Sequence, residues 1–186
     1  MTAGKGAAAF AAAPADLRAL RRADALGAAE RNVRRLAHLR GALADAVAGG
    51  RLAEAVGLRA SAVALGADPT RVALEAAAAA AEATGGATID DRGLPVSGPG
   101  FVVASALGTA FAVAAGRADS ARLAADAAED LLAAGAPAVG YWVNPAGQIE
   151  VDPVEVVGDL ADALRLGRER KQAAVYDLGA GEVVFL

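Results

Sequence analysis

The pattern of the sequence changes at Thr84-Gly85-Gly86, and this change limits the folds open to the chain. Before it, apolar residues recur with the spacing of amphipathic helices, and after it short runs of β-branched residues alternate with turn residues. The change predicts a helical region in residues 1–84 and a separate domain in residues 85–186. The second segment holds its own strands and helices, so we expect it to fold alone.

The second segment is predicted to be an α+β domain. Strands are expected near residues 87–90, 101–107, 109–114, 138–143, 148–151, 173–177 and 182–185, and helices over residues 118–134 and 153–171. The uncharged stretch Phe101–Gly116 indicates a buried hairpin that turns at Gly108-Thr109. Because short turns join antiparallel strands, we predict a helical region followed by a mainly antiparallel sheet with two helices packed on it.

In the first segment a long helix is predicted to begin near Asp16. Its apolar face is formed by Val33, Leu36, Leu39, Leu43 and Val47, and a basic stripe of Arg31, Arg34, Arg35 and His38 lies opposite. The stripe would suit a nucleic acid or an acidic protein, and a solvated helix surface is the simpler explanation. His38 has no carboxylate or second histidine beside it in the helix, so no catalytic or ligand role is predicted for it.

Residues 61–72, SAVALGADPTRV, resemble a helix-turn-helix whose second helix begins at Asp68-Pro69. Thr70 and Arg71 would then face DNA. Glu75 occupies a position where the motif takes an apolar residue, and the alanine run that follows it offers no donor to base edges. DNA binding through this motif is therefore an alternative to simple helix packing.

Composition narrows the chemistry. Cysteine is absent, which excludes disulfides, thiol nucleophiles and thiolate metal sites and leads us to expect a cytoplasmic location. Hydrophobic residues make up 55% of the chain but aromatic residues only 4%, so the core is expected to be thin.

The two segments differ in net charge. Residues 1–84 carry 11 Lys/Arg and 8 Asp/Glu, which gives a net charge of +3, and residues 85–186 carry 7 Lys/Arg and 14 Asp/Glu, which gives −7. No secretion signal or membrane span is predicted.

The most distinctive stretch is Gly140–Val157, which holds the single tryptophan. The four residues 144–147, Asn-Pro-Ala-Gly, predict a hairpin turn, and the run from Asp152 to Glu155 is typical of a capping box that begins a helix. Tyr141 and Trp142 follow each other in a strand and must point to opposite faces. We expect one of them in the core, and the other could be an anchor for a protein partner.

Glu155, Asp159 and Asp162 would share one face of the last predicted helix. Such a face could bind a cation or supply an acid and a base, but no histidine or oxygen-rich loop accompanies it in the sequence. A solvated face is the preferred interpretation. No catalytic residue, metal ligand or cofactor is therefore predicted.

Two stretches, TIDDRGLPVSGPGFVVA (residues 88–104) and GYWVNPAGQIEVDPVEVVGDLADALRLGRERKQAAVYDLGAGEVV (residues 140–184), carry a resemblance. They resemble a group of proteins of unassigned activity from actinobacterial phages and related mobile elements. The resemblance implies such an origin and a shared module, and it implies no catalytic residues. Residues 106–135 are richer in alanine than the group, and the helical region lies outside the likeness.

Three classes of function follow. A non-enzymatic interaction or structural protein with a protein partner is favoured, because almost every polar feature has a turn or capping explanation. The first alternative is a DNA-associated regulator that uses the basic stripe and the degenerate helix-turn-helix. The second is an enzyme or cation site on the acidic face of the last helix.

Overall fold

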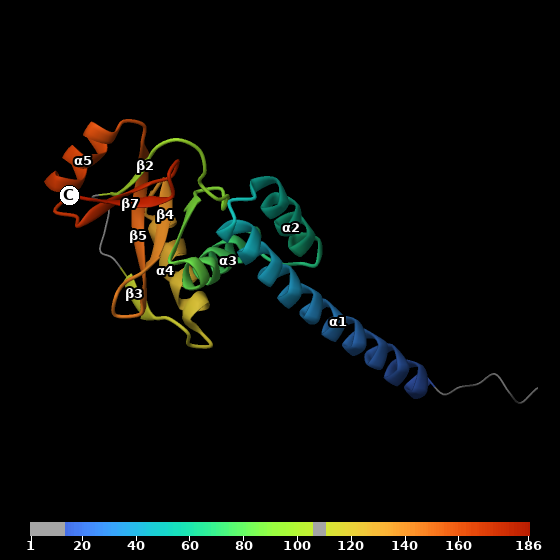
Figure 1. Ribbon diagram of the computed structural model, residues 1–186. Coiled ribbons are helices and arrows are strands. Elements are labelled where there is room, and N and C mark those ends of the chain that lie inside the picture. The colour runs from blue at the N-terminus through green and yellow to red at the C-terminus, as the bar shows by residue number, and fades with distance from the viewer. Residues whose placement is uncertain (1–13, 106–110) are drawn as a thin grey trace, which may run out of the picture. The chain divides into compact units, whose positions relative to one another are not determined.

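The computed structural model describes residues 14–105 and 111–186 (Figure 1). Its helices are α1 (Pro14–Ala48), α2 (Leu52–Ala64), α3 (Pro69–Thr84), α4 (Ser120–Ala133) and α5 (Leu160–Glu169). Its strands are β1 (Gly86–Asp90), β2 (Phe101–Ala104), β3 (Phe111–Ala114), β4 (Ala138–Val143), β5 (Gln148–Val157), β6 (Ala174–Asp177) and β7 (Glu182–Phe185). The chain divides into two compact units, residues 1–37 and residues 38–186.

The first unit contains the amino-terminal part of α1. Among its residues whose side chains are described, Leu26 and Val33 are each 67% exposed. Arg31, Arg34 and Arg35 are exposed as well, and Arg34 lies 4.0 Å from Glu30 on the next turn. The apolar face predicted for this helix is therefore buried only in its later part, where Leu43 and Val47 belong to the second unit.

The second unit is built on one sheet in which the strands follow the order β1-β4-β5-β2-β6-β7 and β3 also pairs with β5. Every strand pair within the described residues is antiparallel. The predicted fold class, α+β with helices preceding an antiparallel sheet, is confirmed. The strands predicted at residues 138–143 and 182–185 have the predicted bounds.

The predicted hairpin of residues 101–116 is wrong. β2 and β3 do not pair with each other, because both lie along the same edge of β5. β2 pairs with Val154–Val157 and β3 with Gln148–Val151, so the ten residues of β5 are long enough to accept both in turn. The turn expected at Gly108-Thr109 lies outside the described residues.

Three helices cover one face of the sheet. That face carries the fully buried side chains of Tyr141, Ile149 and Val151, and α3 and α4 lie against β1, β4 and β5. The strand alternation places Val103 on the same face, where it packs with Val175 of β6 and Ala163 of α5. Helices near α4 and α5 were predicted on the sheet, whereas α3 was predicted as a helix of the separate helical region.

The helix α3 begins and ends as the sequence predicts, but it belongs to the sheet unit. Asp68 accepts a hydrogen bond from the Arg71 amide (2.7 Å), and Gly85 ends the helix in the left-handed conformation (φ 94°). Eight of the sixteen residues of α3 are buried. The change of pattern at Thr84-Gly85-Gly86 thus marks the end of a helix, while the division into units falls between Ala37 and His38.

The helix predicted over residues 153–171 is also corrected, because β5 continues through Val157 and α5 starts only at Leu160. Pro153 is tolerated in this strand for a geometric reason. Its carbonyl accepts the Ser105 amide (2.7 Å), so its nitrogen points to the same edge of β5. That edge has no strand pair at this position, since β3 ends its pairing at Val151 and β2 begins at Val154. The missing N–H falls in the gap.

Candidate functional site

The face of the sheet opposite α3, α4 and α5 is the main candidate for a binding surface. We call it the open face. Strand alternation places on it the side chains of Asp90, Val102, Ala138, Trp142, Glu150, Asp152, Val154, Val156, Tyr176, Val183 and Phe185. Among these only Val102, Ala138 and Val154 are buried, in a small cluster with Val96 and Leu178. Most of the face is therefore accessible.

An apolar row crosses the open face. Val156 is in register with Val102, Val102 with Tyr176, and Tyr176 with Val183, so the four side chains are cross-strand neighbours on β5, β2, β6 and β7. Three of them are exposed: Val156 (44%), Tyr176 (40%) and Val183 (53%). Phe185, two residues along β7, is 79% exposed on the same face. The row is an apolar surface that ends at the edge of the sheet.

Beside the row, the open face is acidic. Trp142 Nε1 donates to Glu150 Oε2 (2.8 Å), and Asn144 Nδ2 donates to Glu150 Oε1 (2.7 Å). Asp152, two residues further along β5, accepts no hydrogen bond and forms no ion pair within the described residues. Its partial burial, and the like charge of Glu150, raise the pKa of Asp152 to about 6.

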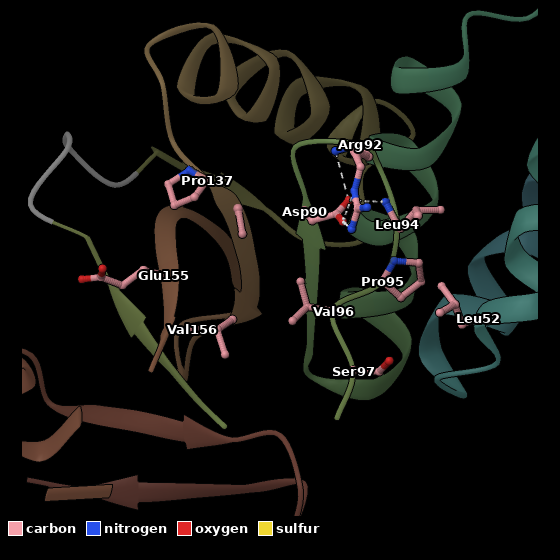
Figure 2. Close-up of a pocket in the computed structure, with 11 residues that line it drawn as sticks. Leu52, Asp90, Arg92, Leu94, Pro95, Val96, Ser97, Pro137, Glu155 and Val156 are labelled. Atoms are coloured by element: carbon pink, nitrogen blue, oxygen red, sulfur yellow. Dashed lines mark hydrogen bonds and ion pairs between the residues drawn. The ribbon is translucent and has the colours of Figure 1, made fainter. Parts of the chain in front are cut away.

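A groove of about 400 Å³ opens at the other end of the apolar row (Figure 2). Leu52 of α2 forms one wall and Val156 of β5 another, with Pro95 and Val96 of the intervening loop between them. Its charged side chains are engaged within the chain: Glu155 pairs with Arg170, and Asp90 pairs with Arg92 (2.7 Å). Asp90 also accepts the amides of Arg92 (3.0 Å) and Leu94 (2.8 Å). The groove extends the apolar surface and presents no free reactive group.

The predicted capping box is wrong, because Asp152 and Glu155 lie in β5. The carboxylate that caps the last helix is Asp159, which accepts the Asp162 amide (3.0 Å). The predicted acidic helix face of Glu155, Asp159 and Asp162 is also wrong, because Glu155 lies in β5 and Asp159 precedes the first residue of α5. Glu155 is paired with Arg170 (2.5 Å), and Asp162 with Arg165 (3.3 Å). Within residues 14–105 and 111–186, no group of three or more His, Cys, Asp or Glu residues is placed to hold a metal ion.

Tyr141 and Trp142 point to opposite faces, as predicted. Tyr141 is 2% exposed in the core, and burial raises the pKa of its hydroxyl group. Trp142 is 45% exposed on the open face. Of the two aromatic residues proposed as partner anchors, only Trp142 is therefore accessible.

The two residues expected to face DNA from the helix-turn-helix are placed differently. Thr70 is half-buried, and Arg71 is held by carboxylates on two helices. Its guanidinium pairs with Glu75 (2.9 Å), Glu129 (3.5 Å) and Asp126. Since α3 is buried along most of its length, it has no free face with which to read bases.

Sequence reasoning missed the apolar row. The sequence does contain part of its pattern: in the last hairpin, Tyr176, Val183 and Phe185 alternate with residues that face the helices. Alternation alone does not say which face the helices cover. Val156 was missed because it was assigned to a helix.

Within the described ranges, no helix combines the length and apolar character needed to cross a bilayer. Comparison with known proteins gives no relative: no family model matches the chain, and neither a curated protein nor a solved structure matches it.

Proposed function

We propose that this chain is a non-enzymatic interaction protein that binds a polypeptide partner on the open face. The observation that carries the proposal is the apolar row, in which Tyr176 and Val183 stand exposed side by side and Val156 stands exposed on the other side of the buried Val102. Exposed apolar surface of this continuity is typical of interaction sites. The neighbouring groove and Trp142 enlarge the surface.

The charges on the open face favour a partner that carries lysine or arginine beside apolar residues. The strands place Asp90, Glu150 and Asp152 on this face, and no described strand residue on it is a lysine or an arginine. Complementary charges set the choice of partner and accelerate association. The absence of cysteine and the ion pairs that hold Asp90, Arg92 and Glu155 in the groove support binding over catalysis. A phage or mobile-element origin stays a prediction of the sequence resemblance.

The proposal predicts selective binding of a cationic apolar peptide. The probe is a ten-residue peptide that alternates valine and lysine, and its control has glutamate in place of lysine. Trp142 is the only tryptophan in the chain, so its fluorescence reports on the open face. We expect saturable binding of the lysine peptide that weakens as salt rises, and no binding of the glutamate peptide.

Variants sharpen this test. Replacing Val156 and Tyr176 with serine should weaken binding by about 10-fold or more, and Asp152→Asn should reduce its salt dependence. Val63→Ser is the matched control, since Val63 is an exposed valine (39%) on α2. Equal binding of both peptides, or equal weakening by Val63→Ser, would contradict the proposal.

A DNA-associated role is the second candidate, and the exposure of Arg31, Arg34 and Arg35 supports it. We expect the full chain to bind random duplex DNA at low salt if this role holds. Replacing the three arginines with glutamine should then lower the slope of log affinity against log salt by about 2.7, which is about 0.9 for each phosphate contact. Arg165→Gln, which removes an exposed arginine of α5, is the control. No binding at 50 mM salt would exclude the basic stripe as a DNA site.

A further inference from the structure

The strand β7 has a free backbone edge. It pairs with β6 on one side, and no described strand pairs with its other side. The Leu186 amide donates to the Ala173 carbonyl (3.2 Å), so the alternation of an antiparallel ladder turns the backbone groups of residues 182, 184 and 186 toward β6. The N–H and C=O groups of Val183 and Phe185 consequently point away from the sheet.

This edge is short, at four residues, and it lacks lysine, proline and a bulge, which often prevent pairing between chains. Edge strands are commonly protected by lysine, proline or a bulge, and β7 reads Glu-Val-Val-Phe with no bulge in its register. Apart from Glu182, its side chains are apolar on both faces. Val183 and Phe185 stand exposed on the open face, and Val184 packs on the helix-covered face beside α5.

We propose that β7 pairs with β7 of a second copy of this chain, antiparallel about a two-fold axis at Val184. In this register Val183 of each copy lies opposite Phe185 of the other, and the two Val184 residues face each other. The two Val183–Phe185 pairs are the hydrogen-bonded pairs of the ladder, and each exchanges two bonds. The open faces of both copies then lie on the same side, and their apolar rows join.

The charges of the edge favour a second copy as the occupant. Glu182 is the only charged residue of β7, and the two-fold axis places it opposite Leu186 of the other copy. The two Glu182 residues are then separated by four residues along the strands, roughly 13 Å. Screening at physiological salt acts over about 8 Å, so repulsion between them is weak. The strand is thus complementary to itself in backbone and side chains, and the two-fold register places no two glutamates opposite each other.

The test measures the mass of the full-length chain by sedimentation velocity across a concentration series. The wild type is expected to form a dimer at concentrations up to 100 μM. Two double variants, V183K/F185K and V183E/F185E, place like charges opposite each other in the two-fold register. Each variant alone should raise the dissociation constant by at least about 100-fold.

An equimolar mixture of the two double variants separates loss of pairing from loss of folding. Lysine of one copy then faces glutamate of the other in both pairs, so the mixture should form a heterodimer. A monomeric wild type at 100 μM, a dimer that survives both double variants, or a mixture that stays monomeric would each overturn the proposal. The two surfaces share Val183, but the peptide test uses variants of Val156, Tyr176 and Asp152, none of which lies in β7, so the two proposals can fail separately.

Discussion

Residues 38–186 are expected to unfold in one cooperative transition, whereas residues 85–186 should show no cooperative transition in urea. The shorter fragment lacks α3, which lies against β1, β4 and α4. Val72 and Leu74 are fully buried in that contact, and burial of each such side chain contributes about 1.5–3 kcal/mol. With six buried alanines of α3 also removed, the loss is comparable to the whole stability of a domain, about 5–15 kcal/mol.

Circular dichroism at 222 nm and amide exchange are suitable measurements for the two fragments. A point variant provides a control that keeps the chain length: Leu74→Ala in residues 38–186 should lower the free energy of unfolding by about 2–5 kcal/mol and retain cooperativity. A folded and cooperative fragment of residues 85–186 would instead support the boundary that the sequence pattern predicts.

Asp152→Asn is expected to stabilise the protein at pH 7.5 by about 1–2 kcal/mol. The pKa of this carboxyl group is about 6 in the folded chain, against 3.8 for the unfolded group. A raised folded pKa means that ionisation opposes folding, so the penalty is absent below pH 4, grows between pH 4 and 6 and is complete above pH 6. The full difference would correspond to about 3 kcal/mol, and partial exposure of the side chain reduces it.

Urea unfolding of the wild type and of Asp152→Asn at pH 4 and pH 7.5 tests whether ionisation of Asp152 opposes folding. The stabilisation by Asp152→Asn should be present at pH 7.5 and vanish near pH 4. Asp159→Ala is the comparison, because it removes the cap of α5 and should cost about 0.5–2 kcal/mol at pH 7.5. A destabilising Asp152→Asn together with a neutral Asp159→Ala would mean that the helix begins at residue 152 after all.

In the candidate site, the sequence predicted correctly those features that depend on the backbone preference of a few adjacent residues. The turn at residues 144–147 forms as predicted: the Asn144 side chain accepts the amides of Ala146 and Gln148 (both 3.0 Å), and Gly147 takes a positive φ of 72°. Strand alternation likewise separated Tyr141 from Trp142. It could not show that Val156 and Tyr176 both lie beside Val102, because these three residues come from strands far apart along the chain.

By itself, the sequence determined the elements whose signals are local. Asp68, Pro69 and Gly85 set the ends of α3 because capping and left-handed backbone depend on residues within one turn of the helix. Only the tertiary structure decided the role of Asp152-Pro153, which reads equally as a helix start or as a strand. Pairing with β4 on one side, and the gap between β2 and β3 on the other, made it a strand. The open face was decided in the same way, because exposure depends on which distant helices cover the sheet and not on the strands themselves.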